Sequence, residues 1–245
     1  MKYFPAPSLS IFDMRTIATF FMLASIAAAG EIVIESPSAR AHLIELFTSE
    51  GCSSCPPADA WLRGLKSERG LWREFVPIAF HVNYWDHLGW TDRLASPRFT
   101  QRQRDYAAAW RANSVYTPGF VMDGREWRGR ELPRASAEKA GVLKVRLVDD
   151  RVSVSFPLNG RKLDAHLVWL AGEVENDVKA GENRGRKLKH EFTALAMESQ
   201  SIDAKSGLAN FTTAKPRDAK AVAAWVTESG HLEAIQATGG ALDPR

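Results

Sequence analysis

Glu45-Leu-Phe-Thr-Ser-Glu-Gly-Cys-Ser-Ser-Cys-Pro-Pro-Ala-Asp59 contains the only two cysteines of a 245-residue chain, Cys52 and Cys55. The segment joins a short apolar run to a stretch with helical periodicity. A Cys-x-x-Cys pair in that setting is typical of a redox-active dithiol. Two cysteines alone do not complete a four-coordinate structural zinc site, and no histidine pair at zinc-finger spacing accompanies them. The segment therefore favours a strand, a dithiol turn and a helix, in that order.

The residues after the second cysteine indicate that the pair lies at the start of a helix. Pro56 and Pro57 fit a first helical turn, where backbone N–H groups have no intrahelical acceptor to lose. Free N–H groups and the positive end of the helix dipole stabilise a thiolate there. We therefore predict that Cys52 lies at the exposed edge and acts as the nucleophile, and that Cys55 resolves the mixed disulfide.

Two other uses of the pair are consistent with the sequence. Cys52 and Cys55 can form a structural disulfide, although closing so short a loop contributes little entropic stabilisation. The two thiolates can also hold a soft ion such as Cu(I), with His81 or His87 as a further ligand.

The composition is that of an ordinary globular protein, with 45 % hydrophobic residues, 25 % charged residues and a formal net charge of +3. The length suits two domains or one enlarged domain. So small a charge does not favour nucleic acid or an anionic membrane surface as a partner. We expect a protein or small thiol as substrate and no organic cofactor, because a cysteine pair carries the electrons itself.

The first thirty residues have the pattern of a secretory signal. An apolar run from Ile17 to Ala29 follows Arg15 and ends in small residues. The run is short for a membrane span, so an uncleaved anchor is the less favoured alternative. Residues 1–13 contain prolines and an acid, and we expect translation to begin at Met14. The mature protein is then periplasmic or secreted, without a stable membrane span, in a compartment where disulfides persist.

Periodicity predicts a β-α-β unit around the cysteines. Residues 41–48 form an apolar run, a helix follows the cysteine turn, and residues 72–82 supply a second strand. Two parallel strands joined by a helix are the expected result. A helical insertion at about 84–115 follows, with a polar helix from Phe99 to Asn113, and Asp123-Gly124 predicts a hairpin turn.

The pattern changes to strict alternation after Gly141, which predicts a β-rich C-terminal domain or extension over residues 142–240. Immediately before it, residues 135–141 are expected to form a short helix. Residues 173–189 are polar and contain glycines, so we predict a long surface loop there. Residues 222–237 are expected to form one more hairpin.

With the downstream Thr117-Pro118 also in place, the chain resembles the thioredoxin superfamily over residues 41–141. The resemblance implies a thioredoxin-like α/β domain with a helical insertion, followed by the β-rich part. It implies a cis-proline at Pro118 that faces the cysteines, with Thr117 aligning an extended substrate peptide. It also implies a buried carboxylate behind the second cysteine as proton acceptor, for which Glu45 is the first candidate and Glu50 the second.

More narrowly, the cysteine segment, Tyr84-Trp-Asp-His-Leu-Gly-Trp90 and Tyr116-Thr-Pro are together similar to an uncharacterised family of secreted bacterial proteins of unknown function. A loop that carries exposed aromatic residues and a histidine is often functional. We therefore predict a substrate groove at the rim of the dithiol, formed by Trp85, Asp86, His87, Trp90 and Tyr116. The alternative is that the aromatic residues only pack a helix against the sheet.

Together these patterns predict an exported thiol–disulfide oxidoreductase that acts on protein thiols through its Cys-x-x-Cys pair. The alternatives are a secreted thioredoxin-fold binding module with a structural disulfide, and a periplasmic Cu(I)-handling dithiol protein.

Overall fold

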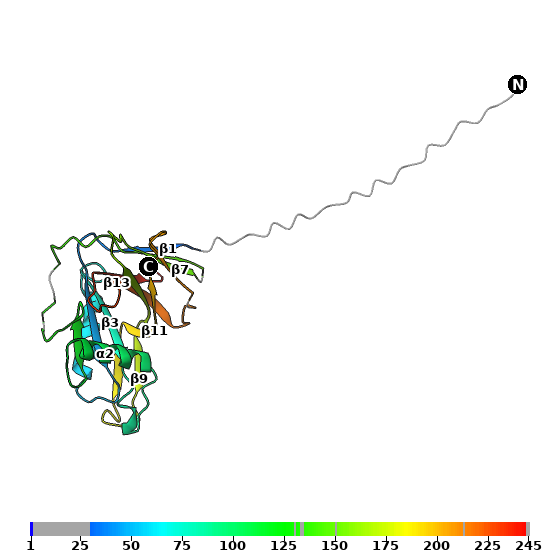
Figure 1. Ribbon diagram of the computed structural model, residues 1–245. Coiled ribbons are helices and arrows are strands. Elements are labelled where there is room, and N and C mark those ends of the chain that lie inside the picture. Colours follow the sequence, from blue (N-terminus) through cyan, green and yellow to red (C-terminus); the bar gives the residue numbers. More distant parts are fainter. Residues whose placement is uncertain (2–29, 130, 133–134, 150, 213, 244–245) are drawn as a thin grey trace.

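The computed structural model describes Met1 and residues 30–129, 131–132, 135–149, 151–212 and 214–243 (Figure 1). The predicted secretory signal and the expected start at Met14 lie outside the described residues. The described helices are α1 (Pro56–Gly64), α2 (Pro97–Ala109) and two short 3-10 turns, η1 (Leu65–Ser67) and η2 (Asp86–Leu88). None of the helices in these ranges is long and apolar enough to cross a membrane.

The predicted thioredoxin-like α/β class is wrong, because the protein is mostly β-sheet. Across the described part of the chain there are fourteen strands in three sheets and only two α-helices. The helical insertion supplies just one of those α-helices. Some strands after residue 141 extend the sheet begun in the first half and others form further sheets, so strands outweigh helices throughout (Figure 1).

The largest sheet has eight strands in the order β14-β13-β8-β11-β3-β2-β4-β5. Their bounds are β2 (His42–Thr48), β3 (Phe75–His81), β4 (Gly119–Met122), β5 (Arg125–Glu126), β8 (Leu163–Ala171), β11 (Thr193–Ser201), β13 (Ala219–Glu228) and β14 (Gln236–Ala241). As predicted, β2 and β3 are parallel and α1 lies between them in sequence. On its other edge β3 meets β11, so the sheet combines strands from both sides of residue 142.

The two faces of this sheet carry different layers. Side chains alternate along a strand, so on β2 Ile44 and Leu46 pack with α1 while Leu43 and Phe47 pack with residues of α2. The two α-helices therefore cover opposite faces, and α2 crosses the sheet in front of β3 in Figure 1. This division decides which residues of β2 and β3 can reach the cysteine turn.

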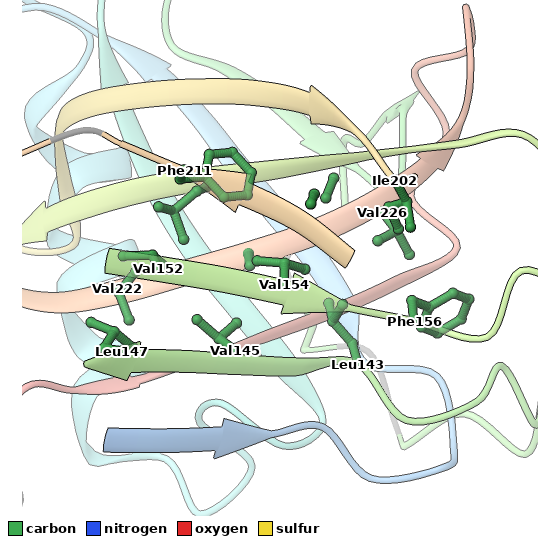
Figure 2. Close-up of a cluster of buried hydrophobic side chains, with 14 of the residues drawn as sticks. Leu143, Val145, Leu147, Val152, Val154, Phe156, Ile202, Phe211, Val222 and Val226 are labelled. Atoms are coloured by element: carbon green, nitrogen blue, oxygen red, sulfur yellow. The ribbon is translucent and has the colours of Figure 1, made fainter. Parts of the chain in front are cut away.

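A second sheet covers the far end of the face that α1 covers. Its order is β1 (Ile32–Glu35), β6 (Lys144–Val148), β7 (Arg151–Ser155) and β12 (Leu208–Phe211). Figure 2 shows the core between the sheets, where Val145 and Val154 lie near Val222 and Val226. As the alternation predicts, Lys144, which directly precedes the buried Val145 on β6, is exposed.

The third sheet is a hairpin of β9 (Val174–Asp177) and β10 (Lys187–His190), which pair antiparallel. The long surface loop predicted for residues 173–189 is therefore wrong. The short helix predicted for residues 135–141 is also wrong, since this segment contains no helix and makes an isolated bridge between Ala39 and Lys139. The hairpins β4–β5 and β13–β14 are present as predicted.

Candidate functional site

The two cysteines form a disulfide at the start of α1. Their Cα atoms lie 5.5 Å apart, and Cys55 is the residue that precedes the first helical position. Its carbonyl oxygen accepts the backbone N–H groups of Ala58 and Asp59. The predicted exposure of Cys52 is wrong, because Cys52 is 1 % exposed and Cys55 is fully buried.

The tip of the β9–β10 hairpin covers the disulfide. The Asn183 amide Nδ2 donates to the carbonyl oxygens of Glu50 and Cys52, both at 2.9 Å. The neighbouring Glu182 carboxylate accepts the backbone N–H of Ser53 at 3.0 Å. A polar hairpin whose donors match the carbonyl groups of the turn therefore excludes solvent from the sulfurs.

Glu50 is a fully buried carboxylate directly before the cysteine turn. It accepts hydrogen bonds from Trp90 Nε1 at 2.8 Å, from Asn176 Nδ2 and from His190 Nε2 at 3.3 Å. Burial raises the pKa of Glu50, but these donors outweigh it and hold the pKa below its ordinary value. Glu50 is therefore ionised at neutral pH.

His190 is a buried cation beside two carboxylates. Burial lowers its pKa, but Asp59 and Glu50 outweigh that effect and raise the pKa from 6.5 to about 9. Its Nδ1 lies 3.9 Å from Asp59 Oδ1 and has no hydrogen-bond partner among the residues described. Asp59 is itself buried and accepts the Thr48 hydroxyl at 3.1 Å.

A second acid–histidine pair adjoins the first. His81 Nδ1 lies 2.7 Å from Asp92 Oδ2, and the same oxygen accepts the Glu50 N–H at 2.9 Å. Burial raises the pKa of Asp92, but the charge and hydrogen bond of His81 outweigh it, so the pKa is lowered. The His81 and His190 rings meet edge to face, with centroids 4.7 Å apart. Five buried ionisable side chains thus lie around one turn.

Strand parity separates the two predicted carboxylates. Thr48 and His81 are cross-strand partners on the face that α1 covers, whereas Glu45 lies an odd number of positions before Thr48. Glu45 therefore points to the α2 face, where Arg102 Nε donates to it at 2.5 Å and the Tyr106 hydroxyl also donates. The carboxylate on the cysteine side is Glu50, the second candidate.

The predicted cis-proline lies next to the cysteine turn. The Thr117–Pro118 bond is cis and directly precedes β4, the antiparallel neighbour of β2. Trp85 connects the two features: its Nε1 donates to Thr117 Oγ1 at 2.8 Å, and its Cβ contacts Gly51 so closely that a Gly51 Cβ would lie 2.8 Å away. Glycine at position 51 thus permits Trp85 to pack against the cysteine turn while its Nε1 bonds Thr117, the residue before Pro118.

The structure brings only part of the predicted groove together. Besides Trp85, Trp90 bonds to Glu50, and Asp86 Oδ1 accepts the backbone N–H of Asp92 at 3.2 Å. His87 instead bonds the Tyr84 carbonyl on the surface. Tyr116 is 46 % exposed, donates to Glu126 and lines a mostly apolar cavity of about 470 Å³ on the α2 face.

The histidines considered as Cu(I) ligands have other partners. Nδ1 of His81 bonds Asp92, and His87 bonds the Tyr84 carbonyl. Over the ranges that the structure covers, no three or more His, Cys, Asp or Glu side chains are grouped to hold a metal ion.

Sequence reasoning missed Asn176 and Asn183, which lie in the segment interpreted as a loop, and His190, which directly follows it. One signal was available. In Lys187-Leu-Lys-His190 the charged lysines alternate with Leu188 and His190, which is the period of a strand, and in the structure Leu188 and His190 are the buried positions.

Residues 43–227 match the model of a protein family described as "Protein of unknown function (DUF1223)". No curated protein matches the chain. A crystal structure of a protein from Agrobacterium tumefaciens is similar, with 26 % identity, a TM-score of 0.59, and coverage of 82 % of this chain and 94 % of that one. HBP35 of Porphyromonas gingivalis is similar in fold, with 15 % identity, a TM-score of 0.52, and coverage of 84 % and 76 %.

Proposed function

Because this chain belongs to the DUF1223 family of proteins of unknown function, its activity has to be inferred from its site, and we propose that it performs thiol–disulfide exchange with another exported protein. The exported location rests on the apolar run from Ile17 to Ala29. The reactive group is the Cys52–Cys55 pair.

The observation that carries the proposal is the set of buried ionisable groups around the cysteine turn. Glu50, Asp59, His81, Asp92 and His190 are all nearly or fully buried there. Burying charged groups costs several kcal/mol per ion even when they are paired. A disulfide that served only to close a short turn would need none of them, whereas groups with shifted pKa values are typical of reactive sites.

The exchange proceeds in two steps that conserve atoms and electrons. A substrate thiolate attacks Sγ of Cys52, the Cys52–Cys55 bond breaks, and Cys55 leaves as a thiolate. A second substrate thiolate then attacks the substrate sulfur of the mixed disulfide, and Cys52 leaves as a thiolate. The substrate becomes a disulfide, and two electrons and two protons pass to the cysteine pair. The reverse reaction uses the same steps with reduced protein and a substrate disulfide.

The surroundings favour the thiolates that this reaction forms. Cys55 lies at the positive end of α1, which lowers the pKa of a nearby thiol. The cationic His190 is buried near the same turn, where it offsets the charges of Glu50 and Asp59. Trp85 and the cis-proline Pro118 provide the surface beside the pair on which an extended substrate can lie.

A binding module with a structural disulfide is the second candidate, and one observation favours it. Cys52 is 1 % exposed and accepts the Asn183 amide at its carbonyl oxygen, and Cys55 is fully buried. Exchange with a protein substrate therefore requires the hairpin tip to move, whereas a structural disulfide requires no movement.

The reduction potential of the cysteine pair distinguishes these functions. Mature protein is equilibrated in graded thiol buffers, and free thiols are counted by alkylation. A potential between about −120 and −270 mV, the range of known exchange catalysts, supports exchange. A value below about −300 mV identifies a structural bond and overturns the proposal. A Cys55→Ser variant supplies an independent readout, because its Cys52 should trap a substrate as a stable mixed disulfide, whereas Cys52→Ser should trap less.

A further inference from the structure

A groove runs between α1 and β10 beside the cysteine turn. It has a volume of about 230 Å³ and begins at Pro56, the residue after Cys55. Its sides carry four cationic side chains, Arg63, Arg186, Lys187 and Lys189. The turn that holds the reactive pair therefore adjoins a groove that carries four cationic side chains and one acid, Asp59.

The two lysines are already neutralised by the neighbouring strand. Lys187 pairs with Glu175 at 2.7 Å, and Lys189 pairs with Glu175 at 3.0 Å and with Glu173 at 3.8 Å. Their charges are therefore shared with acids of the same hairpin and contribute little net attraction for a ligand.

The two arginines keep their charge. Arg63 donates to the Lys189 carbonyl at 3.2 Å, and Arg186 donates to the Asn183 amide oxygen at 2.8 Å. Within the described ranges neither forms an ion pair with a carboxylate. A guanidinium has five donors, so each keeps several for an incoming anion, and paired N–H groups match a carboxylate.

The groove also reaches a buried cation without a full set of partners. His190 is 1 % exposed, lines the groove, and has no hydrogen-bond partner at Nδ1 among the residues with defined positions. Asp59 is the only carboxylate in the lining, and it lies 3.9 Å from that nitrogen. Glu50 and Asp59 thus already balance the charge of His190, and among the described residues the lining cations without a carboxylate partner are Arg63 and Arg186.

We propose that the substrate of the exchange carries Asp or Glu beside its reactive cysteine, and that this acidic flank binds in the groove to Arg63 and Arg186. The inference rests on the proposed function and adds the substrate class. The groove holds one or two carboxylate side chains with a few waters, since a water occupies about 30 Å³. Binding there positions the substrate cysteine next to the Cys52–Cys55 turn.

The test compares three synthetic peptides that share one cysteine and differ only in its neighbours, which are Glu, Gln or Lys. Oxidised mature protein is mixed with each peptide, and opening of the protein disulfide is followed by alkylation and mass spectrometry. Each rate is divided by the rate of the same peptide with bis(2-hydroxyethyl) disulfide. That ratio removes the effect of the flanking charge on the peptide thiol itself.

We expect the normalised rate to fall in the order Glu, Gln, Lys, with about a tenfold or greater difference between the extremes at low salt. The preference should shrink at high salt, because exposed charges are screened. The double variant Arg63→Gln/Arg186→Gln should lose most of it. Arg151→Gln, which removes an exposed arginine on β7, should keep it.

Equal normalised rates for the three peptides would overturn the groove proposal and leave the exchange function standing. The same would follow if the double variant kept the full preference. If no peptide opened the disulfide in native protein, although the unfolded protein reacted, both the exchange function and the substrate class would be wrong.

Discussion

At the scale of single residues, the charge of His190 has the most direct consequence for stability. Its folded-state pKa of about 9 lies above the ordinary value of 6.5, because Asp59 and Glu50 outweigh its burial. The folded protein therefore binds a proton that the unfolded chain releases between these pH values. This stabilisation is complete below pH 6.5 and is lost as the pH rises to about 9.

The free energy of unfolding should accordingly fall by on the order of 3 kcal/mol between pH 6.5 and about 9, since one pKa unit corresponds to about 1.4 kcal/mol. Urea unfolding of the oxidised protein at a series of pH values measures it. His190→Gln should lower stability at pH 6 and flatten the profile. His231→Gln, at an exposed histidine, should leave the stability at pH 6 and its dependence on pH unchanged. A profile that kept its slope in His190→Gln would show that another group titrates.

Single residues of the cysteine site show which features could be predicted from the sequence alone and which could not. The cysteine turn and the start of α1 could be predicted, because local sequence encodes them, whereas the cis bond at Pro118 was implied by the resemblance to the thioredoxin superfamily. The orientation of Glu45 required the strand register: it shares its face with Phe47 and meets Arg102, which is 57 positions away in the chain. Such a contact depends on tertiary packing, which local periodicity does not contain.

At the scale of elements, the β9–β10 hairpin controls access to the disulfide. Its contacts with the turn are polar, through Asn183 to the carbonyl groups of Glu50 and Cys52 and through Glu182 to Ser53. Contacts of this kind contribute about 1 kcal/mol each, so the tip can open at modest cost while the sheets stay folded.

Asn183→Ala should therefore increase the rate at which dithiothreitol reduces the native protein. Loss of two hydrogen bonds of about 1 kcal/mol each favours the open state by about tenfold or more. The rate of reduction is measured by timed alkylation under conditions in which nearly all of the protein stays folded. Asn210→Ala, at an exposed asparagine of β12, is the matched control and should react as the parent does. An unchanged rate in Asn183→Ala would mean that reductant reaches the sulfurs without opening of the hairpin.

The β9–β10 hairpin is also the element that the sequence analysis predicted wrongly, as a loop. Residues 173–189 are polar, and the glycines at the tip, Gly181 and Gly185, both adopt positive φ. Such composition is shared by loops and by two-stranded hairpins whose exposed positions carry charge. Two buried residues of this segment, Asn176 and Asn183, bind the polar cysteine turn instead of an apolar core, so hydrophobic periodicity was weak at both.

At the scale of the whole molecule, the cysteine site depends on strands that follow it by more than a hundred positions. Thr193 of β11 pairs with Ala79 of β3, and His190 is the last residue of β10, with two residues between it and the start of β11. On the opposite face, the Arg102 guanidinium lies 4.7 Å from the centre of the Trp225 ring. Several strands could be predicted from their alternation, but this pairing of distant segments in one sheet could not.

One sheet shared by both halves should unfold as one unit. Leu170 of β8 is fully buried in the cluster that also contains Phe80 of β3. Leu170→Ala removes buried methyl groups and leaves a cavity, which lowers the free energy of unfolding by about 2–5 kcal/mol. Because β3 and β8 are both bonded to β11, the loss should spread across the whole sheet.

Native-state hydrogen exchange with mass spectrometry tests this coupling. In Leu170→Ala, the slowest amides of β2 and β3 should lose as much protection as those of β8 and β13, since all of them exchange through the same global opening. Val33→Ala, at a side chain 48 % exposed on β1, should change protection little anywhere. Loss of protection confined to residues after 142 would instead mean that the halves unfold separately, and the cysteine site would then keep its structure when the C-terminal strands open.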